Sequence, residues 1–277
     1  MIWLSEVEFI FLGTGGGRFV TISQIRHTGG IRFVSPIDLQ LDPGPGAIVY
    51  SSQAKLNPSR VKAILISHCH PDHYCDGEVF VEAMTSGMTE KRGVLVAPRS
   101  VISGNEVCGP CISRYHRSMP EMVYEVKPGD EVKLSSVVVR AVEARHADPD
   151  TVGFRFKLPS GDIGYTSDTE YFQGMAEHYN GVRLLILCVL RPREAPWRGH
   201  MCTDDAVKIL GEVRAELAVI TDFGMKMVQA NPALQAKYIM EKTGVATIAA
   251  EDNMRIRMGK KIAVSRGGKE VSLEHFF

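Results

Sequence analysis

The chain has 277 residues, enough for one large domain or two small ones, and its 44% hydrophobic content is ordinary for a soluble globular protein. Its 32 Lys and Arg residues equal its 32 Asp and Glu residues, and this balance disfavours a dedicated nucleic-acid binder. The sequence shows no signal peptide and no apolar run of the roughly 20 residues that a membrane span needs. We therefore expect a cytoplasmic protein without membrane association.

The first half of the chain alternates strand signals with glycine turns. Pro98 closes one short apolar run, and residues 99–121 show no clear period, so this segment is a candidate loop or lid. We predict strands at 6–12, 31–41, 47–50, 61–67 and 94–97, and a short helix over 77–89.

The second half repeats the pattern with longer helices. The continuous apolar run 184–190 is typical of a strand buried on both faces, and Thr203 can cap a helix with apolar residues at helical spacing. We predict further strands at 131–134, 137–143, 153–158, 163–166, 217–221, 247–250 and 261–264, and helices after Thr203 and over 231–243. No linker or repeat divides the chain, so we expect one domain, 1–277, with two sheets packed between helices.

The most informative segment, residues 68–73, reads HCHPDH and follows a predicted strand. It places three imidazoles and a carboxylate within six residues, at the point where a strand end presents them together. These donors suit zinc, manganese or iron. The alternative is a histidine-rich surface loop that binds nothing.

This motif matches the HxHxDH motif of the metallo-β-lactamase superfamily, and other segments in order resemble its ribonuclease Z-like branch. The resemblance runs from about residue 7 to residue 230 and implies an α/β fold, the four-layer αββα sandwich, with metals at one edge of the sheets. The matching segments are the opening strand and glycine turn 9–17 (FIFLGTGGG), the turn 41–44 (LDPG), His146 with 153–155 (GFR), and 165–169 (YTSDT).

The resemblance also implies two divalent ions, with zinc as the leading choice and manganese or iron as alternatives. It assigns His68, His70 and His146 to the first metal, and Asp72 and His73 to the second. Asp168 would bridge the two ions.

Two later segments complete the family pattern with one departure. Residues 199–203 (GHMCT) match the segment of a proton-donating histidine, and 219–223 (VITDF) match the segment of the last metal ligand, with Asp222 where histidine is expected. We assign Asp222 to the second metal and His200 to acid–base catalysis. The rival interpretation makes His200 the ligand and Asp222 structural. With Asp222 as ligand, the second site has three carboxylates, and this harder site favours manganese or iron more than an imidazole-rich site would.

The implied mechanism is attack by a metal-bridging hydroxide, with His200 protonating the leaving oxygen and Asp72 orienting the nucleophile as well as binding metal. Asp42 either orients a ligand imidazole from behind or only forms the turn before Pro43. Basic residues in irregular segments that could border a substrate pocket are Arg18, Arg26, His27 and His116.

The leading functional hypothesis is a phosphodiesterase acting on a small phosphodiester or cyclic nucleotide. Ribonuclease Z commonly carries a tRNA-binding arm between its third histidine and bridging aspartate, and here only 147–167 separates them. The alternatives are a lactone or carboxylic ester hydrolase, a ribonuclease without that arm, and a non-catalytic metal-binding protein. The expected partner is a small molecule, and a homodimer is compatible with the family.

Six cysteines are present, and free thiols are the default for a cytosolic protein of this size. Residues 108–111 (CGPC) match a redox tetrapeptide but lie in a loop-like segment rather than at a helix start. We expect a local disulfide or a structural loop there. An accessory zinc site would need further ligands such as His116.

Overall fold

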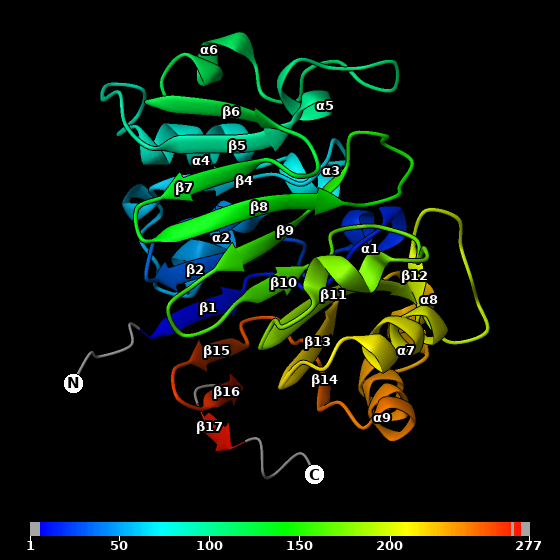
Figure 1. Ribbon diagram of the computed structural model, residues 1–277. Helices are drawn as coiled ribbons and strands as arrows, with labels where there is room; N and C mark the ends of the chain where they lie inside the picture. Colours follow the sequence, from blue (N-terminus) through cyan, green and yellow to red (C-terminus); the bar gives the residue numbers. More distant parts are fainter. Residues whose placement is uncertain (1–5, 267–268, 273–277) are drawn as a thin grey trace.

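The computed structural model describes residues 6–266 and 269–272, and within them the chain forms two large sheets (Figure 1). The first sheet has the order β17-β16-β15-β1-β2-β3-β4-β5-β6, and the second has the order β14-β13-β11-β10-β9-β8-β7 with β12 beside β11. The strands of the first sheet are β1 (Val7–Phe11), β2 (Ile31–Ser35), β3 (Leu39–Leu41), β4 (Ala63–Leu65), β5 (Val94–Pro98), β6 (Met122–Val126), β15 (Arg255–Met258), β16 (Ile262–Arg266) and β17 (Lys269–Ser272). Those of the second are β7 (Glu131–Leu134), β8 (Val137–Glu143), β9 (Val152–Lys157), β10 (Ile163–Tyr165), β11 (Leu184–Arg191), β12 (Met201–Cys202), β13 (Leu217–Thr221) and β14 (Thr247–Ala249).

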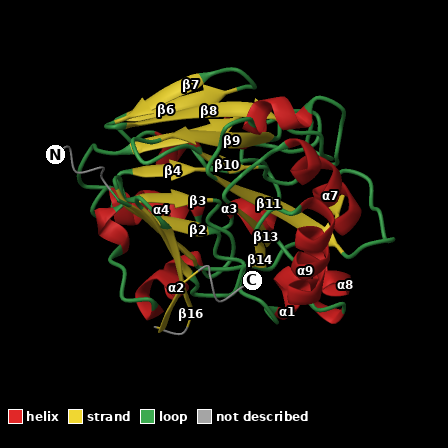
Figure 2. Ribbon diagram, turned by 60° about the horizontal axis from the view of Figure 1, so that its bottom comes forward, coloured by secondary structure: helices red, strands yellow, loops and turns green. Residues whose placement is uncertain are grey.

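Helices cover the outer faces of the paired sheets. Figure 2 shows α2 and α4 on one side and α7, α8 and α9 on the other. The helices are α1 (Arg18–Ser23), α2 (Ala47–Gln53), α3 (Pro71–Tyr74), α4 (Gly77–Met84), α5 (Arg99–Ile102), α6 (Arg114–Arg117), α7 (Thr203–Glu212), α8 (Met225–Gln229) and α9 (Pro232–Thr243), with 3-10 turns at Pro58–Arg60 and Met175–Tyr179.

Three apolar cores hold these layers together. The largest lies between the sheets and includes Phe9, Phe33 and Phe156. The second joins the second sheet to α7 and α9, and the third joins the first sheet to α2, α4 and α5. Burial of apolar surface on both faces of each sheet stabilises this layering, so the predicted four-layer α/β arrangement is confirmed.

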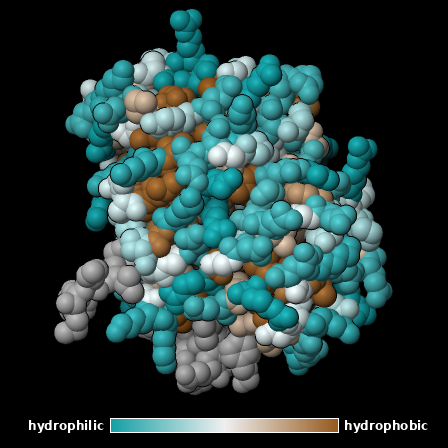
Figure 3. All heavy atoms as spheres, viewed as in Figure 1, coloured by the Kyte–Doolittle hydropathy of each residue, from teal (hydrophilic) through white to brown (hydrophobic). Residues whose placement is uncertain are grey.

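The surface has the opposite character from these cores. Figure 3 shows mostly hydrophilic side chains on one face, with hydrophobic side chains visible between them. Among the described residues, no helix is long and apolar enough to cross a membrane.

Parallel strand pairing determines where the functional side chains meet. Strands β3, β4, β5 and β6 run parallel in the first sheet, and β10, β11, β13 and β14 run parallel in the second. Loops that follow parallel strands leave from the same edge of a sheet, so residues directly after β3, β4, β10 and β13 are brought together.

Several predicted elements differ from the structure. The strand predicted at 47–50 is helix α2, because Gly46 takes a left-handed φ of 85° and the Asp76 carboxylate accepts the Ile48 amide at 3.0 Å. These groups stabilise the N-terminus of α2, whereas the residues at 47–50 taken alone favour a strand.

Three smaller predictions are also corrected. The strand predicted at 31–41 is two antiparallel strands, β2 and β3. The segment 99–121, predicted to be a loop or lid, contains α5 and α6. The N-cap of α7 is Cys202, while the hydroxyl of Thr203 donates to Gln235 at 2.9 Å. Helix α1 and strands β6 and β15 were not predicted.

Candidate metal centre

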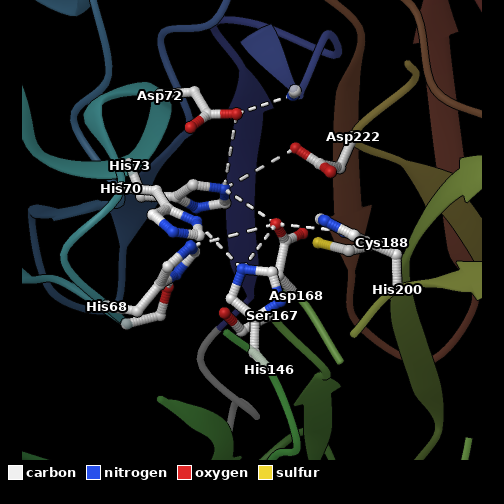
Figure 4. Close-up of polar contacts among 12 residues, drawn as sticks. His68, His70, Asp72, His73, His146, Ser167, Asp168, Cys188, His200 and Asp222 are labelled. Carbon is white, nitrogen blue, oxygen red and sulfur yellow. Dashed lines mark hydrogen bonds and ion pairs between the residues drawn. The ribbon is translucent and has the colours of Figure 1, made fainter. Parts of the chain in front are cut away.

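Four histidines and three aspartates of the predicted set meet at one edge of the sandwich (Figure 4). His68 follows β4, and His70, Asp72 and His73 lie at helix α3. The other three members leave the second sheet: His146 after β8, Asp168 after β10 and Asp222 after β13.

One group of donors contains His68, His70, His146 and Asp168, whose potential ligand atoms all lie within 4.8 Å of one another. Nε2 of His146 is 2.9 Å from Nδ1 of His70 and 3.6 Å from Oδ2 of Asp168. Three nitrogen atoms and one carboxylate oxygen thus converge, as a tetrahedral divalent cation requires.

The second group contains Asp72, His73 and Asp222, again with ligand atoms within 4.8 Å of one another. Nε2 of His73 is 3.7 Å from Oδ1 of Asp222 and 3.9 Å from Oδ2 of Asp168. That same Asp168 oxygen is 3.9 Å from Nε2 of His68, so it lies between the two groups.

Buried polar atoms without a hydrogen-bond partner test whether these groups fit metal ions. Nε2 of His68, Nε2 of His73, Oδ1 of Asp168 and Oδ2 of Asp222 are buried and unpaired. Such atoms carry a desolvation cost that a bound cation would offset. The nitrogen and carboxylate donors therefore fit divalent metals.

The electrostatics of the cluster agree with this fit. Burial, with a further contribution from neighbouring imidazoles, lowers the pKa of His70 and of His146 to about 4, so both rings are neutral near pH 7. Burial raises the pKa of Asp168 to about 6, and burial together with the charge of Asp168 raises the pKa of Asp222 well above its usual range. A cation between these carboxylates would reverse both increases.

Asp42 orients two imidazoles of the cluster through hydrogen bonds. Its Oδ2 accepts a hydrogen bond from Nδ1 of His73 at 3.0 Å, from the Ser67 hydroxyl at 2.8 Å and from the Tyr165 hydroxyl at 2.6 Å. The Ser67 hydroxyl in turn lies 3.0 Å from Nδ1 of His68. Both imidazoles are thereby oriented with Nε2 toward the cluster. The residue also forms a turn, because Gly44 donates its amide to the Asp42 carbonyl.

The backbone at the cluster is strained at three non-glycine residues. Asp42, Ser167 and Asp222 take φ values of 47°, 56° and 61°. Left-handed backbone at such residues costs energy and concentrates at functional sites. Their occurrence beside three separate strand ends indicates that the positions of Asp42, Asp168 and Asp222 are specified by the fold.

His200 lies beside the first group. Its Nδ1 is 3.4 Å from Oδ2 of Asp168, and its ring meets that of His146 edge-on at 4.6 Å. The preceding residue, Gly199, accepts a hydrogen bond at 2.6 Å from Nδ1 of His146, which turns Nε2 of that ring toward the cluster. The segment 199–200 therefore orients one imidazole and supplies another.

Comparison with known proteins identifies the family. The family model for the beta-lactamase superfamily domain matches residues 39–223, about two thirds of the chain. The chain belongs to the metallo-β-lactamase superfamily. Among its relatives, an uncharacterized protein of Methanocaldococcus jannaschii is 42% identical over 265 residues, covering 95% of this chain and 97% of that protein.

Other members of the superfamily are more distant. Ribonuclease Z of Pyrococcus furiosus is 30% identical over 157 residues, which cover 54% of this chain and 48% of that enzyme. The metallo-β-lactamase fold protein YhfI of Bacillus subtilis superposes with a TM-score of 0.75 at 17% identity, covering 91% of this chain and 99% of that one. A diphosphatase of the PhnP family superposes with a TM-score of 0.64 at 16% identity, covering 92% and 98%.

The four predicted substrate-binding residues are placed differently from one another. Arg18 is exposed directly after Gly17, whose amide donates to Asp72 at 2.7 Å, and Arg26 lies 5.7 Å from the ring of Phe223, the neighbour of Asp222. Each arginine thus lies next to a residue that adjoins an aspartate of the cluster.

The two histidines of that set make their contacts elsewhere. His27 stacks on Tyr50 at 3.8 Å. His116 forms ion pairs of 3.2 Å with Glu78 and Glu82 of α4, and the structure does not bring it together with the metal cluster.

Three residues at or near the site were not predicted. Asp148 is buried and accepts the Cys69 amide at 3.0 Å and the Asn105 amide group at 3.1 Å, so it joins the segment 99–121 to the HCHPDH motif. Arg191 is close enough to His200 for its charge to add to the effect of burial in lowering the pKa of that histidine. Cys188 lies with its sulfur within 4.8 Å of donor atoms of Asp168 and Asp222. Cys188 and Arg191 read in sequence as part of an apolar strand and its end, which gives no functional signal.

The CGPC segment contains free thiols in the structure rather than a disulfide. Burial and a hydrogen bond with the Cys69 thiol raise the pKa of Cys108 to about 12. Cysteines that act in redox catalysis have lowered pKa values, so this environment is that of a structural loop.

Proposed function

We propose that the protein is a dinuclear metal-dependent phosphodiesterase that hydrolyses a small phosphodiester. The observation that carries this proposal is the position of Asp168 Oδ2, which lies within 4 Å of nitrogen atoms from His68, His73, His146 and His200. One carboxylate oxygen thus adjoins both donor groups and an additional imidazole. That arrangement suits a pair of ions with a proton donor beside them.

Each part of the site has a role in this chemistry. Two divalent ions would supply Lewis-acid activation of water and offset negative charge on the phosphoryl oxygens. His68, His70 and His146 would hold the first ion, Asp72, His73 and Asp222 the second, and Asp168 would contact both. The Gly17 amide fixes one oxygen of Asp72 at 2.7 Å and so sets the direction of the carboxylate.

His200 would donate a proton to the leaving oxygen. Burial lowers the pKa of His200, so the imidazole is mostly neutral near pH 7 in the free protein. The negative charge of a bound phosphodiester would raise that pKa and favour the protonated donor. An uncharged ester would not, and this difference favours the phosphodiester over a lactone or carboxylic ester.

The size of the substrate follows from the segment between His146 and Asp168. Residues 147–167 are largely occupied by β9, β10 and the turn that joins them. This stretch has no room for a projecting arm that binds a folded RNA. The relatives named ribonuclease Z and the structural neighbour named a diphosphatase act on phosphate esters or anhydrides by name, and they support phosphoryl chemistry here.

Metal content and turnover test the proposal together. Wild-type protein and Asp222→Ala should be purified without added metal, and metal per chain and hydrolysis of bis-p-nitrophenyl phosphate and p-nitrophenyl acetate should be measured. We expect two ions in the wild type and one in the variant, with phosphodiester turnover lost in the variant. Asp130→Ala, which removes a half-buried carboxylate from the turn before β7, is the matched control and should keep both.

Three results would contradict the proposal in distinct ways. Unchanged metal content in Asp222→Ala would mean that His200, rather than Asp222, is the ligand of the second ion. Hydrolysis of the acetate but not the phosphodiester would favour an ester hydrolase. Full metal loading without turnover of either substrate would favour a metal-binding protein.

A further inference from the structure

Cys188 lies on the strand between the two strands that lead to Asp168 and Asp222. Strand β11 lies between β10, which leads to Asp168, and β13, which leads to Asp222. Cys188 is paired in register with Thr221, the residue before Asp222. Its sulfur points into the cluster in Figure 4 and lies within 4.8 Å of donor oxygens of both aspartates.

The thiol of Cys188 makes a weak hydrogen bond. Its Sγ donates to the Tyr165 hydroxyl at 3.6 Å, and that hydroxyl donates to Asp42 at 2.6 Å. Cys188 is only 2% exposed, so solvent does not solvate the sulfur. A buried thiol that faces two carboxylates, each with one unpaired oxygen, is poorly matched to a purely apolar role.

Asp222 stands where a histidine is expected, and this replacement leaves a role for the thiol as an additional ligand. An aspartate side chain is shorter than a histidine side chain and reaches less far from the strand end. A sulfur on the adjacent strand stands on the same side of the cluster as Asp222 and offers one more donor. The group Asp168, Cys188 and Asp222 meets the same distance criterion as the groups built on His68 and His73.

We propose that Cys188 is a ligand of the second metal ion, which its thiolate binds beside Asp168 and Asp222. This inference rests on the proposed dinuclear site. Binding would release the thiol proton to solvent and form a sulfur–metal bond, with no change in oxidation state. No other cysteine among the described residues belongs to a donor group with these aspartates.

The proposal changes the expected metal. Carboxylates and one imidazole alone make a hard site that favours manganese or iron. A thiolate is a soft donor that favours zinc and cobalt over manganese. The second site should therefore take zinc from an equimolar mixture of zinc and manganese in the wild type, and this preference should weaken when the sulfur is removed.

Cobalt(II) provides a direct readout, because a thiolate bound to cobalt(II) gives a sulfur-to-metal charge-transfer absorption in the near ultraviolet. Metal-free protein should be titrated with cobalt(II) for wild type, Cys188→Ser, Cys188→Ala and Cys202→Ser. Cys202 is the matched control, because it is as buried as Cys188 and its sulfur lies 3.2 Å from Asp205 rather than at the cluster. Serine is also a good N-cap for α7, so this control should fold.

We expect the charge-transfer band to appear with the second equivalent of cobalt in the wild type and in Cys202→Ser. The band should be absent in Cys188→Ser and Cys188→Ala, while the visible bands of the first cobalt ion remain and show that the variants are folded. A band that keeps its intensity in Cys188→Ser, or a wild type that binds two cobalt ions without the band, would overturn the proposal.

The spectrum also separates this inference from the proposed function. A wild type that shows the band but hydrolyses no phosphodiester would refute the activity and leave Cys188 as a ligand. A wild type that hydrolyses phosphodiesters and binds two cobalt ions without the band would refute Cys188 as a ligand and support the activity. A protein that binds one cobalt ion or none would refute both.

Discussion

A Cβ atom on Gly16 would stand 1.9 Å from Oδ1 of Asp222, so the carboxylate occupies the space that any other side chain at position 16 would need. The same two segments are tied by backbone contacts, because the Gly16 amide donates to the Phe223 carbonyl at 3.2 Å. The glycine turn near the N-terminus is therefore matched to the aspartate that ends β13. The absence of a side chain, rather than backbone freedom, is what position 16 requires.

Gly16→Ala should therefore impair the second donor group. The new methyl group would displace the Asp222 carboxylate, and a misplacement of about 1 Å at a reacting centre costs on the order of 100-fold in rate. We expect turnover of bis-p-nitrophenyl phosphate to fall by about that factor, with loss of the second metal ion and retention of the first. Metal analysis and kinetics on the same preparation would check this.

Gly211→Ala is the control for this substitution. Gly211 lies in α7, and a Cβ there meets nothing within 4 Å. Alanine is favoured over glycine in a helix by about 1 kcal/mol, so this variant should be as stable as the wild type or slightly more stable. Full activity and two metals in Gly16→Ala would mean that Asp222 can move without consequence, contrary to a ligand role.

Removing the support behind His73 gives a second prediction. Asp42→Asn replaces a carboxylate that accepts three hydrogen bonds on one oxygen with an amide that cannot accept all of them. Changes of this kind behind a ligand imidazole typically cost about 10–100-fold in metal affinity or activity. Tyr165→Phe removes one of those donors and leaves the contact with His73, so its loss should be smaller. Equal losses in both variants would contradict the view that Asp42 acts mainly through His73.

The sequence predicted the metal cluster better than the elements around it, for a physical reason. Most of the cluster lies in short segments that follow strands, so the HCHPDH motif, His146 and Asp168 are recognised by their resemblance to the ordered segments of the family. Asp222 is placed by the same resemblance, in the segment 219–223 at the end of a continuous apolar strand. The helix at 47–53 could not be predicted, because its N-terminus is satisfied by Asp76, which is distant in the chain.

Cys188 and Asp148 show the same limit at the site itself. Cys188 reads as one more apolar residue of a buried strand, and its neighbourhood depends on the pairing of β11 with β10 and β13. Asp148 reads as a loop carboxylate, although it is buried and contacts Cys69 and Asn105, which precede it by 79 and 43 residues. Contacts between distant segments carry this information, and no local pattern encodes them.

His200→Gln distinguishes the two readings of the late histidine. If His200 donates a proton, its loss should lower kcat by roughly 10²–10⁴-fold and leave two metal ions bound. If it is a metal ligand instead, the variant should lose an ion, as Asp222→Ala is expected to do. A substrate with a better leaving group needs less protonation, so the rate loss should shrink when bis-p-nitrophenyl phosphate is compared with a poorer leaving group of the same class. A loss that is independent of the leaving group would contradict the proton-donor role.

The buried imidazoles predict how the stability of the metal-free protein depends on pH. Burial lowers the pKa of His70 to about 4 in the folded protein, against 6.5 for the free side chain. The unfolded chain then binds more protons than the folded chain between those two values, so stability is present above pH 6.5 and is lost as the pH falls toward 4. Replacing His70 with asparagine removes this contribution, whereas Asp168 and His73, whose pKa values are raised, remain in both proteins. Urea unfolding of chelator-treated protein between pH 4.5 and 7 should therefore show a shallower dependence of the unfolding free energy on pH in His70→Asn, by up to about one proton. Identical slopes in the two proteins would mean that His70 is protonated as easily in the folded chain as in the unfolded one, and that the ring is not held neutral for a metal ion.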